Sequence, residues 1–167
     1  MDIRIAKDEK DSIAVSYIHA MGWKTGYKHI YSEQLLSNIT ETHWVSACNS
    51  SYSKSSFAFA IMRVDDEDIG AGSYGICEEC PDGSVGEIRS MYFLEKAWGK
   101  GYSKQLMDFM MQKLRQSGCR EIRLWTLKEN FRAQRFYEKY GFRKTGNEMP
   151  WNTRHGNEPK TAIEYVL

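Results

Sequence analysis

The segment from Trp98 to Ser103 carries two glycines two positions apart, Gly99 and Gly101, where an expected strand gives way to an expected helix. Glycines let backbone amides close around an anion, and a helix start adds unpaired N–H groups and the positive end of the helix dipole. The pattern predicts a bound phosphate group, although a plain tight turn would explain the same glycines. Neither the triphosphatase loop nor the dinucleotide fingerprint fits, since Lys104 stands where the latter needs its third glycine.

A second informative segment, residues 130–142, follows after one helix and one strand. Asn130 is an N-cap residue by type, and Gly141 stands where a C-cap glycine belongs. Aromatic and apolar residues recur between them at helical spacing and include Tyr137. A tyrosine on an apolar helix face is either a packing residue or, within a site, a proton donor.

Together the two segments resemble the GNAT superfamily of acyl-CoA-dependent N-acetyltransferases. The later family motif, Asn-x-x-Ala-x-x-Phe-Tyr-x-x-x-Gly-Phe, is matched at every fixed position from Asn130 to Phe142. The pyrophosphate motif, Gln/Arg-x-x-Gly-x-Gly/Ala, is matched at Gly101, with the small residue Ser103 at its last position. Trp98 departs from this motif at the Gln/Arg position. The resemblance is specific over roughly residues 87–142.

The resemblance implies acetyl-CoA as cosubstrate. The parallel strands that start at Glu87 and Glu121 would splay apart and admit the pantetheine arm, which backbone groups of residues 91–93 would bind. The turn over residues 99–103 would hold the pyrophosphate. The expected cofactor-binding residues are Met91, Tyr92, Phe93, Trp98, Gly99, Lys100, Gly101, Tyr102, Ser103, Asn130 and Ala133.

The resemblance also implies a catalytic role for Tyr137, whose phenol would protonate the departing thiolate. An alkylammonium has a pKa of about 10.4, so the amine must lose a proton before it attacks the thioester directly. Glu87 is the expected base, and a salt bridge at the start of the strand is the equal alternative. Catalysis would come mainly from positioning and from polarisation of the carbonyl group.

The acceptor site is expected among aromatic residues of the first helices, because in this family that region shapes it. Trp23, Tyr27 and Tyr31 are the expected substrate-binding residues, with Trp44 and Trp151 as further candidates. Aromatic faces attract cations, yet the same rings would serve equally as helix-packing residues.

The elements that must position these residues follow from hydrophobic periodicity. Strands are expected at 3–6, 57–62, 69–77, 87–94, 121–127 and 161–166, with another at Phe142. Helices are expected at 8–29, after Ser32, at 101–117 and after Asn130, and residues 44–56 are expected to form a loop with a frayed helix end. The resulting fold is α/β (α+β): a GNAT-like mixed central sheet of six to seven strands, flanked by about four helices, with splayed parallel central strands. It would form a single domain over residues 1–167.

Composition limits the partners. With 23 Lys and Arg against 22 Asp and Glu, the net charge of +1 gives no general footprint for nucleic acid, and no apolar run is long enough to span a membrane. Cys77 and Cys80 have zinc-ligand spacing but lack a second pair, so no metal is expected. Four scattered cysteines without a signal-like segment favour the cytoplasm.

The sequence therefore predicts an N-acetyltransferase that moves an acetyl group from acetyl-CoA to a primary amine of a small molecule. The alternatives are a protein N-terminal or lysine acetyltransferase acting on a peptide amine, and a catalytically silent acyl-CoA-binding module. A homodimer rests on family analogy alone.

Overall fold

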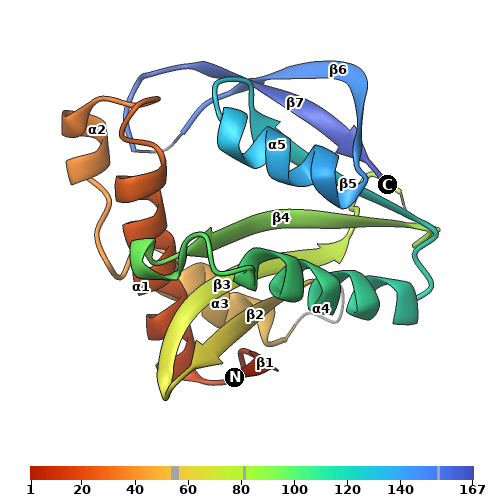
Figure 1. Ribbon diagram of the computed structural model, residues 1–167, viewed down its shortest axis with the longest axis horizontal. Helices are drawn as coiled ribbons and strands as arrows, with labels where there is room; N and C mark the ends of the chain where they lie inside the picture. Colours follow the sequence, from red (N-terminus) through yellow and green to blue (C-terminus); the bar gives the residue numbers. More distant parts are fainter. Residues whose placement is uncertain (54–56, 81, 154) are drawn as a thin grey trace.

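A seven-stranded mixed sheet runs through the computed structural model, which describes residues 1–53, 57–80, 82–153 and 155–167 (Figure 1). The strands are β1 (Asp2–Ile5), β2 (Phe57–Val64), β3 (Glu67–Ile76), β4 (Val85–Phe93), β5 (Glu121–Leu127), β6 (Arg143–Trp151) and β7 (Lys160–Val166). The helices are α1 (Glu9–Gly26), α2 (Glu33–Ser37), α3 (Val45–Ser51), α4 (Tyr102–Gln116) and α5 (Phe131–Tyr140), with a 3-10 turn at Glu95–Ala97. The predicted mixed α/β fold is confirmed.

The centre of the sheet opens as the resemblance to the GNAT superfamily implies. The strand order is β1-β2-β3-β4-β5-β7-β6, and β4 and β5 are parallel neighbours. Their pairing ends at Ile88 and Leu124. Beyond this pair, β4 continues beside β3 and β5 continues beside β7, so the two strands diverge. The sheet is therefore continuous at one end of β4 and split at the other.

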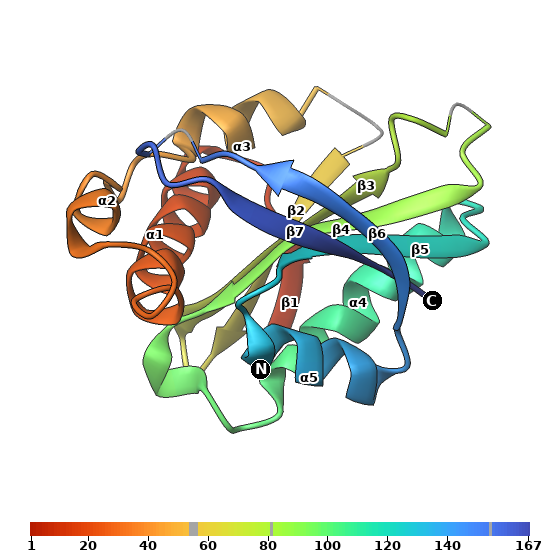
Figure 2. The same cartoon turned by 90° about the horizontal axis from the view of Figure 1, so that it is seen from above.

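Helices cover both faces of this sheet (Figure 2). On one face α1 packs against β2, β3 and β4 and α3 packs against β2, and on the other face α4 packs against β2, β3 and β4. The α4 contact is the predicted apolar stripe of Leu106, Met110 and Leu114, all of which are buried. Gly118 follows the helix with φ +95°, a conformation that glycine adopts at little cost. The sheet thus separates two helical layers that approach the split from opposite sides.

Helix α3 is the main departure from expectation, because residues 44–56 were expected to form a loop with a frayed helix end. The backbone N–H of Trp44 donates to Ser16 Oγ in α1 at 2.9 Å, and Cys48 and Ser51 are buried. These tertiary contacts stabilise a short helix that a polar sequence does not specify by itself. Residues 54–56 of the expected loop lie outside the described residues, as does Pro81 between the strands expected at 69–77 and 87–94.

The first helix also differs, since α1 ends at Gly26 rather than near His29. None of the described helices has the length and apolar character needed to cross a membrane.

Candidate active site

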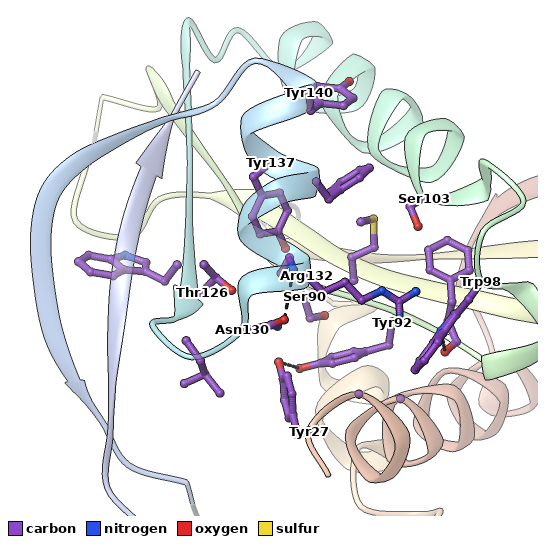
Figure 3. Close-up of a pocket in the computed structure, with 18 of the residues that line it drawn as sticks. Tyr27, Ser90, Tyr92, Trp98, Ser103, Thr126, Asn130, Arg132, Tyr137 and Tyr140 are labelled. Carbon is purple, nitrogen blue, oxygen red and sulfur yellow. Dashed lines mark hydrogen bonds between the residues drawn. The ribbon is translucent and has the colours of Figure 1, made fainter. Parts of the chain in front are cut away.

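A cavity of about 930 Å³ lies where β4 and β5 diverge (Figure 3). The end of α1, the second half of β4, the turn before α4, the first turns of α5 and the end of β5 contribute to its walls. The expected site residues that line it are Trp23, Tyr27, Met91, Tyr92, Phe93, Trp98, Gly99, Gly101, Ser103, Asn130, Ala133 and Tyr137. The fold thus gathers in one place residues that the sequence analysis took from three separate segments.

Four expected site residues are not among the lining residues. Tyr31 is 4% exposed and packs in the cluster around Trp23. Lys100 is exposed on the turn, and Tyr102 packs against the core beneath α4. The Glu87 carboxylate accepts a hydrogen bond from Arg89 Nε at 3.0 Å, which is the ion pair offered as the alternative reading. The base role of Glu87 stays a prediction without a contact to the cavity.

The glycine turn has the backbone geometry of an anion site. Gly99 and Gly101 have φ of +76° and +81°, which side chains disfavour, and a Cβ at either position would meet open space. Gly101 is the N-cap of α4 and provides no side-chain cap, so the first N–H groups of the helix remain available. The N–H groups of residues 99–101 likewise have no backbone acceptor among the described residues. The turn therefore presents several donors at the positive end of a helix.

Trp98 joins this turn to the neighbouring elements. Its indole N–H donates to the Phe93 carbonyl oxygen at 3.2 Å, which ties the turn to the end of β4. The guanidinium carbon of Arg132, in the first turn of α5, lies 3.6 Å from the centroid of the Trp98 ring. Both side chains line the cavity, so the Trp98 ring holds the Arg132 cation at the wall beside the glycine turn.

Asn130 and Tyr137 stand on the same side of α5. The Asn130 Oδ1 accepts the Ala133 N–H at 3.2 Å, so it caps α5 and still lines the cavity with its side chain. Figure 3 shows Tyr137 projecting from α5 into the cavity. Its hydroxyl has no hydrogen-bond partner among the described residues, and burial raises the pKa of this phenol above its usual range. A protonated hydroxyl is therefore available to donate to a group in the cavity.

The opposite wall is aromatic. The hydroxyls of Tyr27 and Tyr92 lie 3.1 Å apart, and burial raises the pKa of both phenols. Trp23 meets Tyr27 edge-on, with ring centroids 4.8 Å apart, and stacks on Tyr31. A Cβ at Gly22 would lie 2.7 Å from Tyr92 Cβ, so this glycine allows α1 to approach β4. Tyr31 therefore supports a wall that it does not itself line.

Comparison with known proteins agrees with this geometry. A family model described as "Acetyltransferase (GNAT) family" matches residues 22–142, which is more than half of the chain. The chain belongs to the GNAT acetyltransferase family. No curated protein matches the sequence.

Solved GNAT structures share its fold at low sequence identity. The PaiA N-acetyltransferase of Thermoplasma acidophilum, in complex with coenzyme A, is 20% identical with a TM-score of 0.74, over 98% of each chain. An N-acetyltransferase of Staphylococcus aureus Mu50 is 17% identical with a TM-score of 0.76, over 99% of this chain and 96% of that one. The ribosomal-protein-alanine N-acetyltransferase of Brucella melitensis is 19% identical with a TM-score of 0.72, over 100% of this chain and 99% of that one.

Sequence reasoning missed Arg132 in this GNAT acetyltransferase, because it occupies an unspecified position of the later motif. A signal was nevertheless present in the sequence. A cation in the first turn of a helix is disfavoured by the helix dipole, so Arg132 needs another reason to stand there. Stacking on Trp98 beside the glycine turn supplies one.

Proposed function

We propose that the protein transfers the acetyl group of acetyl-CoA to a primary amine of a small molecule. One observation carries the proposal: a single cavity contains both the glycine turn and the free hydroxyl of Tyr137. A long molecule with a phosphate group at one end and a reactive thioester at the other would therefore meet an anion site and a proton donor together.

The cosubstrate would lie between β4 and α5. The turn over residues 99–103 would receive the pyrophosphate, and Arg132 would add the charge that Trp98 does not bring to the motif. Residues 91–93 pair with β3 on one edge and have no strand partner on the β5 edge, so the backbone groups that face this edge, such as the N–H of Met91, would be available to the amides of the arm. Asn130 would complete this side of the site.

The chemistry needs no covalent enzyme intermediate. The neutral amine forms a C–N bond at the thioester carbonyl carbon, and a backbone N–H of β4 would stabilise the developing oxyanion. The C–S bond then breaks, and Tyr137 would give its proton to the departing thiolate. After attack the nitrogen would give one proton to a basic group or to water, and the Tyr137 phenoxide would later take up a proton from water.

The aromatic wall favours a small amine with an apolar or aromatic body. Trp23, Tyr27 and Tyr92 can hold a cation or an aromatic ring with little charge nearby. Asp108 is the one carboxylate among the lining residues, and its oxygens are engaged by Lys104 Nζ at 2.7 Å and Tyr140 Oη at 2.6 Å. Among the described residues that line the cavity, a polyamine would thus find no unpaired carboxylate for its second charge.

Two measurements test the proposal. Calorimetric titration with acetyl-CoA should show saturable binding, and absence of binding would overturn it. Thiol release should then be measured with 2-phenylethylamine, spermidine and a peptide with a free N-terminal alanine. We expect the highest kcat/KM for 2-phenylethylamine. A highest value for the peptide would move the acceptor to protein amines, and binding without thiol release from any amine would indicate a silent acyl-CoA-binding module.

A matched pair of variants tests the cofactor side. Arg132→Ala should weaken acetyl-CoA binding by about tenfold, since a hydrogen bond to a charged group contributes about 1.5–3 kcal/mol. Arg135 is an exposed arginine of the same helix and is not among the residues that line the cavity. Arg135→Ala should therefore leave the affinity for acetyl-CoA unchanged. Equal effects would contradict a specific role for Arg132.

A further inference from the structure

A buried histidine lies directly behind the cavity. His19, in the middle of α1, is 2% exposed, and its Nδ1 lies 2.9 Å from the carbonyl oxygen of Val15. A carbonyl oxygen only accepts hydrogen bonds, so Nδ1 carries the ring hydrogen. In a neutral imidazole Nε2 then holds a lone pair, and it lies 2.9 Å from the Ser90 Oγ. Ser90 therefore donates its hydrogen to His19.

The second hydrogen bond of Ser90, to Ser73, fixes the direction of donation along the Ser73–Ser90–His19 series of hydrogen bonds. Ser73 is the partner of Ser90 in the β3–β4 register and is 3% exposed, and the two Oγ atoms lie 2.6 Å apart. Since the Ser90 hydrogen is committed to His19, Ser73 must be the donor. A hydroxyl has two lone pairs, and Ser73 uses one of them. The other lone pair of Ser90 is free, and Ser90 lines the cavity.

The place of Ser90 in the sheet puts it at the split between β4 and β5, among the residues that line the cavity. Ile88 makes the last β4–β5 pair, and a register shift inserts Arg89 as an extra residue before the Ser73–Ser90 pair. The bulge lies where the strands separate, and bulges commonly reorient side chains next to active sites. Ser90 appears in Figure 3 between the Tyr27–Tyr92 pair and Tyr137.

We propose that Ser90 accepts the proton that the amine loses after attack, while its own proton passes to Nε2 of His19. This inference rests on the proposed acetyl transfer. The nitrogen becomes strongly acidic once it is bonded to the carbonyl carbon. Its N–H bond breaks as an O–H bond forms on Ser90, the former Ser90 O–H bond breaks, and an N–H bond forms on His19. The imidazolium later returns its extra proton through the same hydroxyl to water.

In this scheme Ser90 touches the acceptor, and His19 is a positioning residue that acts through it. The rings around His19 belong to Trp44, Phe59 and Tyr92 and carry no charge at neutral pH. Burial lowers the pKa of His19 to about 4, so the ring is neutral before reaction and the imidazolium does not accumulate. Glu87, the base expected from sequence, has no contact with this chain of hydrogen bonds.

Kinetics with 2-phenylethylamine and acetyl-CoA provide the first arm of the test. Ser90→Ala should lower kcat by about 100-fold, within the usual range for proton-transfer catalysis, and leave calorimetric acetyl-CoA affinity unchanged. Ser90→Thr retains the hydroxyl and should recover most of the kcat that Ser90→Ala loses. His19→Gln can still accept the Ser90 hydrogen bond but cannot take up a proton, so it should lose kcat as Ser90→Ala does. A near-normal kcat in His19→Gln would show that the Ser90–His19 hydrogen bond has only a structural role, and it would overturn the proposal.

Imidazole buffer separates chemistry from structural damage. At constant pH and ionic strength, thiol release by Ser90→Ala should rise with imidazole concentration, because an external base replaces the missing acceptor. Wild-type turnover should not respond, and a flat response in Ser90→Ala would contradict the relay.

The second arm does not depend on turnover. Long-range proton–nitrogen NMR, with the His19 signals assigned by their loss in His19→Gln, should show protonated Nδ1 and bare Nε2 at pH 7. The opposite tautomer would overturn the relay even if acetyl transfer is confirmed. The expected tautomer, in a protein that neither binds acetyl-CoA nor releases thiol, would instead refute the proposed function on which the relay rests.

Discussion

The α4–α5 side and the α1 side of the cavity are built from different materials. On the α4–α5 side the site consists of backbone N–H groups at a glycine turn, with cations such as Arg132 and Lys104 around them. On the α1 side it consists of aromatic rings, tyrosine hydroxyls and a neutral histidine. Recognition by backbone and charge suits a phosphate group, whereas aromatic walls suit an organic amine.

The two sides differ in how far a family sequence motif describes them. Backbone geometry at the turn depends on glycines at fixed spacing, so a family motif captures it. The aromatic wall depends on side chains from α1 and β4, such as Tyr27 and Tyr92, which no short motif spans. Substitutions on one side should therefore change cosubstrate affinity, and those on the other should change the handling of the amine.

The largest expected effect lies where the two sides meet. Tyr137→Phe removes the proposed proton donor, and kcat should fall by about 100-fold when chemistry limits the rate. Affinities for acetyl-CoA and amine should hold, since the ring remains. Stopped-flow thiol release together with calorimetry measures both quantities. An unchanged single-turnover rate would remove Tyr137 from the chemistry.

The next effect concerns stability on the α1 side. Burial lowers the pKa of His19 from its ordinary value of about 6.5, which holds in the unfolded chain, to about 4 in the folded protein. The unfolded chain therefore takes up the proton first as pH falls, and stability present above pH 6.5 is lost between pH 6.5 and 4. At pH 5 this loss is about 2 kcal/mol, which His19→Gln should lack.

Urea unfolding at pH 7 and pH 5 checks this value. Carboxylates whose pKa is lowered, such as Asp68 and Asp108, are present in both wild type and His19→Gln, so their effect on stability cancels in the comparison. Equal losses in wild type and His19→Gln would show that His19 is not the group responsible.

A paired glycine substitution tests the α4 side. Gly101→Val and Gly118→Val each place a side chain at a positive φ, at opposite ends of α4, and each should cost about 1–2 kcal/mol of stability. Only Gly101→Val should weaken acetyl-CoA binding, by about tenfold, because it strains the turn that presents the donors. Thermal unfolding and calorimetry give the two readouts. A similar loss of affinity in Gly118→Val would show that general destabilisation is the cause.

The smallest effect is expected at the aromatic wall. Tyr27→Phe removes the hydroxyl bonded to Tyr92 and should raise KM for the amine by about fivefold, since such a bond contributes about 1 kcal/mol. Acetyl-CoA affinity should not change. Tyr17→Phe, at a half-exposed tyrosine of the same helix, is the control. A change in acetyl-CoA affinity in Tyr27→Phe would break the division between the two sides.

The sequence predicts the α4–α5 side well because its signals are local. The spacing of Leu106 and Leu114 predicts α4, and Gly101 marks its start. The motif from Asn130 to Phe142 then places α5 beside the turn. Each signal lies within one element or at one junction, where periodicity and capping rules apply.

On the α1 side, Trp23 and Tyr27 were expected from the resemblance and do line the cavity, but the contacts behind them could not be predicted because they join distant segments. The hydrogen bond from Ser90 to His19 joins residues 71 positions apart. The register shift before Ser90 cannot be detected from hydrophobic periodicity. The burial of Tyr31 against Trp23 depends on the packing of α2 in the same cluster. Helix α3 likewise forms through its contact with α1 rather than through its own propensity.

The divergence of β4 and β5 gives the sheet two internal edges. Exposed edges ordinarily attract another strand, and proteins protect them because such pairing leads to aggregation. Here the edges face a cavity lined by residues of α1 and α5, which limits access to them. A ligand that pairs with these edges acts as a partial strand and shifts the folding equilibrium by mass action. The opening that admits the cosubstrate thus makes the stability of the sheet depend on its occupant.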